Sequence, residues 1–191
     1  DGGTIVWEWH AWDHLIQDFD AEKDNFGVVA DHPELIDVNF SEPSNSLEDW
    51  HHSNSVDYSS QLDQIVLSVR EFNEFWIIDH GISTEEAQGA AGDLLYRWGN
   101  PRAYDRGDYS DRRISYQHDV RWVPEGYPGA GNITLYSNRH SDNPDATIEE
   151  IAEESDYSMI VEMTPPLLPD GTYALEDGQA YAPAEPTWTY D

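Results

Sequence analysis

The chain contains no cysteine and only one lysine, Lys23. Without cysteine it can form no disulfide, no thiolate metal site and no cysteine nucleophile. No apolar run is long enough to cross a bilayer, so we expect no membrane insertion. The positive charge of the protein is therefore carried almost entirely by arginine.

Positive charge of any kind is scarce. There are 39 acidic residues against nine basic ones, which gives a formal net charge of -30. Such a field repels phosphate groups, which argues against nucleic acid and anionic membranes as partners. The acidic residues are spread along the chain, a pattern typical of halophilic proteins. At molar salt the Debye length falls to about 3 Å, so the repulsion between these acidic residues is screened. We therefore expect an acidic, salt-adapted surface.

Large aromatic residues are abundant, with eight Trp and eleven Tyr. This content indicates a folded protein and favours strands over helices. Short apolar runs bounded by Gly, Pro, Asn, Asp or Ser predict strands over residues 4–9, 64–69, 74–79, 93–98, 132–136, 158–163 and 186–190. Helices are predicted only over residues 83–91, with Ser83 or Thr84 as N-cap, and over residues 147–154.

An internal repeat divides most of the chain into two units. Trp9, Trp98 and Trp188 are almost evenly spaced, and each lies in a short predicted strand with a bulky residue two positions earlier. One unit starts at His52 and ends with Trp98, and the next starts at His118 and ends with Trp188. Residues 52–58 and 118–122 open the units as further predicted strands, so each unit contains four, which is the number in a propeller blade.

The sequence therefore predicts an all-β fold, a β-propeller fragment with two four-stranded antiparallel blades over residues 49–100 and 117–191. Residues 1–9 would supply the outer strand of a preceding blade, and residues 10–48 an inserted loop region over one rim. Because a propeller typically needs about 4–8 blades and the chain starts at Asp1, we expect a piece of a longer protein. The alternative is a self-contained sandwich of two sheets.

Two histidines occupy equivalent places in the repeat. The first strand of a blade lines the central channel, and His52 and His118 both open their units. Two imidazoles in one cavity suit a nucleophile and a general acid/base. His51 would point the opposite way in an extended strand, whereas Asn54 would share the face of His52 and hold a substrate oxygen. The alternative is that each histidine only satisfies a strand end by hydrogen bonding.

Two further candidates lie outside these strand starts. His10, Asp13 and His14 are ligand types found in metal sites, but their spacing matches no standard motif. We interpret them as a rim cluster without metal and keep His14 as a candidate substrate-binding residue. Arg139 follows a predicted strand and would clamp an oxyanion, the alternative being a solvent-exposed arginine.

Several segments resemble successive parts of the aryl-sulfate sulfotransferase (arylsulfotransferase) family, in particular its branch from archaea and environmental bacteria. The motifs D-W-H-H-S-N-S-V at residues 49–56 and Q-H-D at residues 117–119 carry the resemblance. Matching segments cover residues 7–20, 31–40, 49–58, 62–80, 94–104, 117–132 and 178–190. The resemblance weakens between Tyr136 and Ile160, where the family's N-N-G-x-x-R stretch is replaced.

The resemblance implies a six-bladed propeller that moves a sulfuryl group from an aryl sulfate to a phenol, without a nucleotide sulfate donor or another cofactor. In the implied ping-pong mechanism a channel histidine attacks sulfur, and further histidines and an arginine neutralise charge and shuttle protons. His52 and His118 match two of these histidines, and Arg139 lies near the position of the arginine. The resemblance places the sulfated histidine after residue 191, so we expect this fragment alone to be inactive.

The resemblance also implies an extracytoplasmic protein whose partners are a small aryl sulfate and a phenol. Two other functions stay open at this point. One is a non-catalytic propeller that serves as a binding platform, and the other is an arylsulfatase-like hydrolase in which water replaces the phenol.

Overall fold

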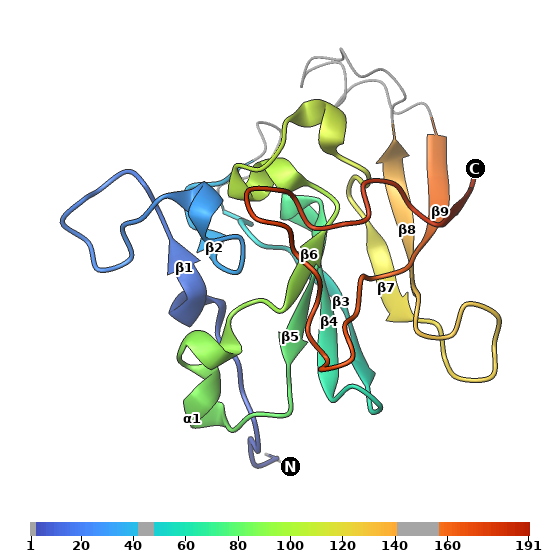
Figure 1. Cartoon of the computed structure of the whole chain (residues 1–191), viewed down its shortest axis with the longest axis horizontal. Helices are drawn as coiled ribbons and strands as arrows, with labels where there is room; N and C mark the ends of the chain where they lie inside the picture. Colours follow the sequence, from blue (N-terminus) through green and yellow to red (C-terminus); the bar gives the residue numbers. More distant parts are fainter. Residues whose placement is uncertain (1–2, 42–47, 141–156) are drawn as a thin grey trace.

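Two four-stranded antiparallel sheets form the centre of the molecule (Figure 1). The computed structural model describes residues 3–41, 48–140 and 157–191, without the side chains of Arg139 and His140. The first sheet consists of β3 (Ser53–Ser59), β4 (Gln64–Val69), β5 (Glu74–Asp79) and β6 (Tyr96–Trp98), and the second of β7 (His118–Trp122), β8 (Ile133–His140), β9 (Tyr157–Met163) and β10 (Trp188–Tyr190). In each sheet the strands follow one another in chain order, which confirms the predicted architecture of a propeller fragment.

Turn chemistry sets the strand boundaries of the first sheet. Asp63 in the β3–β4 turn and Asn73 before β5 both have positive φ, 52° and 55°. Asp and Asn tolerate this left-handed conformation better than most residues, so they reverse the chain at little cost. Asn73 is also the C-cap of the 3-10 helix η3 (Arg70–Phe72), which joins β4 to β5.

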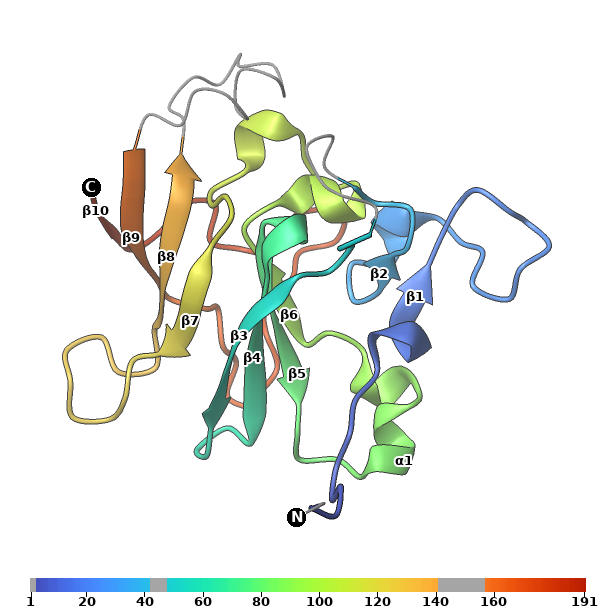
Figure 2. The ribbon, with the colours of Figure 1, turned by 180° about the vertical axis from the view of Figure 1, so that it is seen from behind.

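The inner strands of the two sheets lie side by side (Figure 2). The side chain of Asn54 donates to the carbonyl of Gln117 at 2.7 Å. Further along, the backbone N–H of Val120 donates to the Ser55 hydroxyl, at 2.9 Å. These contacts place the starts of β3 and β7 at the same end of the molecule.

The crossover between β9 and β10, residues 164–187, runs in front of the first sheet (Figure 1). The Tyr96 hydroxyl donates to the carbonyl of Ala182 at 2.7 Å, and the indole N–H of Trp98 donates to that of Pro183 at 2.8 Å. The crossover thus binds one sheet to the other and buries the outer strand β6.

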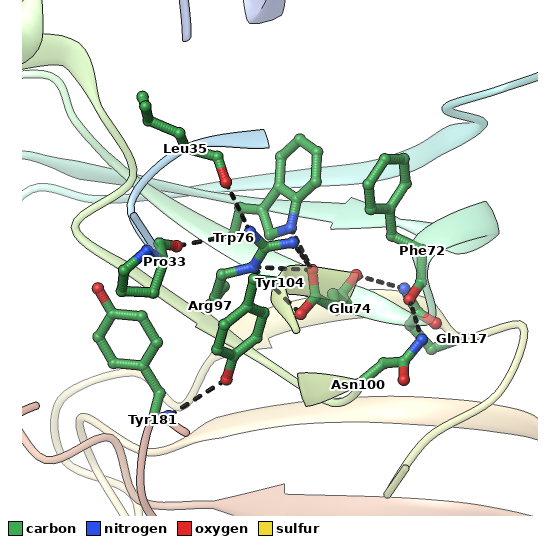
Figure 3. Close-up of polar contacts among 10 residues, drawn as sticks. All are labelled: Pro33, Leu35, Phe72, Glu74, Trp76, Arg97, Asn100, Tyr104, Gln117 and Tyr181. Atoms are coloured by element: carbon green, nitrogen blue, oxygen red, sulfur yellow. Dashed lines mark hydrogen bonds and ion pairs between the residues drawn. The ribbon is translucent and has the colours of Figure 1, made fainter. Parts of the chain in front are cut away.

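A buried ion pair joins three parts of the chain (Figure 3). Glu74 on β5 and Arg97 on β6 are fully buried and lie 2.5 Å apart, Oε2 to Nη2. Arg97 also donates to the carbonyl of Leu35, and the indole of Trp76 donates to Glu74. The side chain of Gln117 donates to the Glu74 carbonyl at 2.5 Å. The network therefore links residues 10–48, the first sheet and the start of the second.

The structure differs from the sequence prediction at the N-terminus. Residues 4–9 form no strand. The indoles of Trp7 and Trp9 instead donate to the carbonyls of Ile82 and Gly92, at 2.9 and 2.7 Å. The segment is therefore held by side-chain contacts to residues between β5 and β6 and not by strand pairing, and Ile5 and Val6 of the apolar pattern are 74% and 90% exposed.

Residues 10–48 contain more regular structure than predicted. The short strands β1 (Leu15–Ile16) and β2 (Ile36–Asp37) pair in parallel, and the 3-10 helices η1 (Ala11–His14) and η2 (Val29–Asp31) accompany them. Strands of two residues are too short to show the alternation from which strands are predicted. The proposed boundaries of the insertion and of the blades remain predictions.

The predicted helix over residues 83–91 is confirmed as α1 (Thr84–Ala87), where Ser83 and Glu86 form a capping box. It is followed by the 3-10 helix η4 (Ala90–Gly92), and the 3-10 helices η5 (Pro101–Tyr104) and η6 (Tyr109–Asp111) lie between the sheets in sequence. The helix predicted over residues 147–154 lies outside the described residues. Among the residues that are described, no helix is long and apolar enough to cross a membrane.

Candidate active site

Both inner strands begin with the same kind of irregularity. His52, just before β3, has φ of 41°, and the pairing of β3 shifts register between Ser53 and Ser55. Asp119, the second residue of β7, has φ of 56°, and the pairing of β7 shifts between His118 and Arg121. Bulges concentrate near functional sites, and left-handed backbone costs more at His52 than at an aspartate such as Asp119. The two histidine-bearing strand starts are therefore the candidate active site.

His52 has one ring nitrogen engaged by a carboxylate. Its Nδ1 bonds Asp49, and 39% of its side chain is exposed. When a carboxylate accepts from Nδ1–H, the lone pair of Nε2 is left available for a proton or an electrophile. The arrangement can therefore orient a proton-transfer group, and the catalytic role of His52 stays a prediction.

His51 lies in an aromatic cluster. Its ring packs edge-on against Trp76 and Phe72, with centroids 5.0 and 6.2 Å away, and its Nδ1 is 2.6 Å from the Ser53 hydroxyl. Burial lowers the pKa of His51 to about 4, opposed only in part by Asp49. The ring is therefore neutral near pH 7. Alternation along an extended strand predicts that His51 and His52 point to opposite sides; His51 lies in this cluster, whereas the side chain of His52 is partly exposed.

His118 opens β7 opposite Tyr136 on β8 and is partly buried. The preceding residue, Gln117, is buried and accepts the hydrogen bond from Asn54 described above. The Asn54 amide nitrogen is thus engaged between the strands, and its Oδ1 is buried without a hydrogen-bond partner among the described residues. The substrate-binding role of Asn54 stays a prediction, as does the convergence of the His52 and His118 rings.

Arg70 is a candidate that the sequence analysis missed. Its backbone N–H donates to the carbonyl of His52 at 3.3 Å, and its guanidinium lies 4.3 Å from the ring centroid of Tyr116. It also pairs with the buried carboxylate of Glu71. Arg70 therefore contacts the segments that lead into both β3 and β7. No motif or spacing marks it in the sequence, since only the fold brings these segments together.

His14 and Arg139 complete the predicted set. His14 is fully buried, its Nδ1 lies 2.8 Å from Asp93 Oδ1, and Trp9 stacks on its ring at 5.0 Å. A substrate could reach His14 only if this packing opened, so its substrate-binding role is supported by no contact and stays a prediction. Arg139 lies on β8, but its side chain is outside the description, and its role too stays a prediction. Within the described ranges, no group of three or more His, Cys, Asp or Glu side chains is placed to hold a metal ion.

Comparison with protein families decides the relationship. The family model "Arylsulfotransferase (ASST)" matches residues 1–164, a span that includes both histidine-bearing strand starts. The chain belongs to the arylsulfotransferase family. No curated protein and no solved structure gave a significant match. Membership of the arylsulfotransferase family indicates a sulfotransferase-type function with small aryl sulfates and phenols as substrates, and the finer assignment to an archaeal or environmental branch stays a prediction.

Proposed function

We propose that the protein is an aryl-sulfate sulfotransferase that moves a sulfuryl group from an aryl sulfate to a phenol through a histidine of the propeller channel. Neither a nucleotide sulfate donor nor another cofactor takes part. The observation that carries the proposal is the arylsulfotransferase match over two adjacent strands that each have a histidine and a bulge at their start. A binding platform would need neither the histidines nor the bulges beside them.

The proposed transfer has two half-reactions. The imidazole lone pair forms an N–S bond while the aryl O–S bond breaks, and the departing phenolate takes a proton from a neighbouring acid. A phenol then gives its proton to a base while its oxygen forms an O–S bond to sulfur and the N–S bond breaks. Each transition state places negative charge on the sulfuryl oxygens, which cationic hydrogen-bond donors stabilise.

We assign proton transfer to His52 and charge stabilisation to His118, Arg139 and Arg70. The contact between His52 and Asp49 supports its role, since a carboxylate at Nδ1 stabilises the imidazolium that forms when Nε2 takes a proton. The contacts of Arg70 with both strand starts support a role beside them. An arginine can donate two parallel hydrogen bonds to a sulfate-like group.

The test is an assay of the full-length protein with a chromogenic aryl sulfate, with and without phenol. A transferase releases the chromophore faster when phenol is present and forms the sulfated acceptor. Chromophore release that is independent of phenol, with free sulfate as product, would show a hydrolase, and no release would show a binding platform. His52→Ala and His118→Ala should each lower turnover about 10²-fold or more. The control His32→Ala changes an exposed histidine paired with Glu34 and should keep full activity.

The same proposal includes an extracytoplasmic, salt-adapted setting. Aryl sulfates and phenolates are anions, so a protein of net charge -30 repels them in dilute buffer. At molar salt this repulsion is screened within about 3 Å, so only the positively charged side chains close to the substrate interact with it. Activity and thermal stability of the full-length protein should therefore rise from low salt to several molar potassium chloride. Highest activity and stability in dilute buffer would contradict salt adaptation.

A further inference from the structure

A pocket lies between the end of β6 and the crossover that covers it. The pocket has a volume of about 370 Å³, and neither His52 nor His118 lines it. Its walls include Trp98, Tyr104, Tyr181, Arg106, Arg113 and Asp111. A pocket of this size with aromatic walls and a few charged groups has the general form of a small-molecule site.

The arginines give this pocket an unusual charge for the protein. Arg106 donates through Nε to the carbonyl of Ala30 and through Nη1 to that of Gln179, both at 2.7 Å. Carbonyl groups fix the guanidinium in place but carry no net charge. No carboxylate of the described residues forms an ion pair with Arg106 within 4.0 Å. Its positive charge is therefore held at the pocket by neutral groups.

Arg113 is fixed in a similar way. It donates to the carbonyl of Ala184 at 2.5 Å and to that of Ser110 at 2.7 Å, and it forms an ion pair with Glu185, whose side chain is 73% exposed. The Asp111 carboxylate accepts from the N–H of Asp108 at 2.9 Å in the capping box of η6. Two of the eight arginines of a strongly acidic chain thus line one pocket.

The aromatic walls are rigid. Trp98, Tyr104 and Tyr181 are almost fully buried, and the rings of the two tyrosines lie 6.2 Å apart at a steep angle. The indole of Trp98 is anchored to Pro183, and the Tyr104 hydroxyl accepts from the N–H of Tyr181 at 3.2 Å. Pre-formed aromatic walls favour a flat ring, because little side-chain freedom is lost when it binds.

We propose that this pocket binds a small aromatic oxyanion, such as an aryl sulfonate, sulfate or carboxylate, with its ring against the aromatic walls and its oxygens at Arg106 and Arg113. The site shares no residue with the candidate active site and does not rest on the proposed transferase activity. Arg106, which is anchored by carbonyls, keeps its charge for the ligand, and Arg113 would have to exchange only an ion pair with the exposed Glu185.

Benzenesulfonate is the probe, because its C–S bond cannot undergo the transfer reaction. Its binding to the full-length protein is measured by calorimetry, and the site is located by the indole N–H signal of Trp98, assigned by its loss in Trp98→Phe. We expect that signal to shift on binding. Benzyl alcohol, which is neutral, and inorganic sulfate, which lacks the ring, should each bind at least about 10-fold more weakly at the same site.

Variants test the role of charge. Arg106→Gln should weaken benzenesulfonate binding at the Trp98 site about 10-fold or more, whereas Arg121→Gln, an exposed arginine outside the pocket, should leave it unchanged. Thermal unfolding establishes that Arg106→Gln is folded, and if it is not, Arg113→Gln takes its place. An unshifted Trp98 signal at saturation, equal binding of benzyl alcohol, or full affinity in a folded arginine variant would each overturn the proposal.

Discussion

The two sheets have the same strand order but very different surroundings. In the first sheet the residues of β5 from Glu74 to Ile78 are all buried, because the crossover, residues 10–48 and the second sheet surround it. In the second sheet β9 alternates between exposed and buried residues, and all of β10 is exposed. Two sheets of the same topology thus differ in how far their central and outer strands are buried. The difference arises because the crossover and residues 10–48 pack against the first sheet.

The open face of the second sheet carries a row of apolar side chains. Tyr136, Ile160 and Tyr190 are paired across β8, β9 and β10 and are 42%, 43% and 63% exposed. In the corresponding row of the first sheet, Trp76 and Arg97 are fully buried and Leu67 is partly buried. We therefore expect the stability of the protein to depend mainly on the first sheet, and the following predictions test this difference.

The largest expected effect is at the buried ion pair of the first sheet. Arg97→Met leaves Glu74 as an unpaired buried carboxylate and should lower the free energy of unfolding by about 3–5 kcal/mol. The matched change in the second sheet, Arg121→Met, removes a pair with Asp119 in which both side chains are more than 60% exposed, and should cost about 1 kcal/mol or less. Urea unfolding at fixed salt measures both.

A further variant separates charge from packing. Burial raises the pKa of the Glu74 carboxyl, and the Arg97 charge opposes this. If the unpaired charge causes the loss, Glu74→Gln combined with Arg97→Met should recover part of it, because the carboxylate is then gone. Equal losses for Arg97→Met and Arg121→Met would contradict the predicted difference between the sheets.

The second effect concerns apolar packing and compares the same residue type in the two sheets. Ile77 on β5 is fully buried, whereas Ile160 on β9 is 43% exposed. Ile77→Ala should lower the free energy of unfolding by about 2–5 kcal/mol, the usual cost of such a change in a core. Ile160→Ala should cost about 1 kcal/mol or less. If Ile160→Ala costs as much as Ile77→Ala, the open face is covered in solution, for example by another part of a longer protein.

The sequence predicts the strands best where apolar runs have clear ends. The predicted ranges 64–69 and 74–79 coincide with β4 and β5, because Asp63 and Asn73 mark the turns before them. The predicted range 93–98 is too long, since β6 includes only Tyr96–Trp98. Asp93 contacts His14 and the Leu94 N–H donates to Glu34, contacts with residues 10–48 that no local pattern reveals.

The candidate site is predicted only in part, for a related reason. The repeat locates His52 and His118 at strand starts, because both units begin with the same arrangement. It cannot locate Arg70, which contacts both segments only through tertiary structure. The rule that neighbouring side chains alternate predicts that His51 and His52 point to opposite sides, and His51 is buried against Trp76 and Phe72 whereas the side chain of His52 is partly exposed.

The smallest predicted effect is a pH dependence at the entry to the first sheet. His51 has an ordinary pKa near 6.5 in the unfolded chain and about 4 in the folded protein, because the ring is buried against Trp76 and Phe72. Between about pH 6.5 and pH 4, His51 is therefore protonated in the unfolded state but neutral in the folded state. Stability is lost as the pH falls from about 6.5 towards 4, by about 1–2 kcal/mol between pH 7 and pH 5.

Because many carboxylates also titrate in this protein, the contribution of His51 has to be taken as a difference between two proteins. His51→Gln keeps a hydrogen-bond partner for Ser53 but cannot be protonated near neutral pH. Between pH 7 and pH 5 the variant should therefore lose about 1–2 kcal/mol less unfolding free energy than the unchanged protein. Urea unfolding of both proteins at the two pH values, in the same high salt, measures the difference. Identical losses would mean that His51 is accessible to protons in the folded state, and the aromatic cluster around it would then not be closed to water.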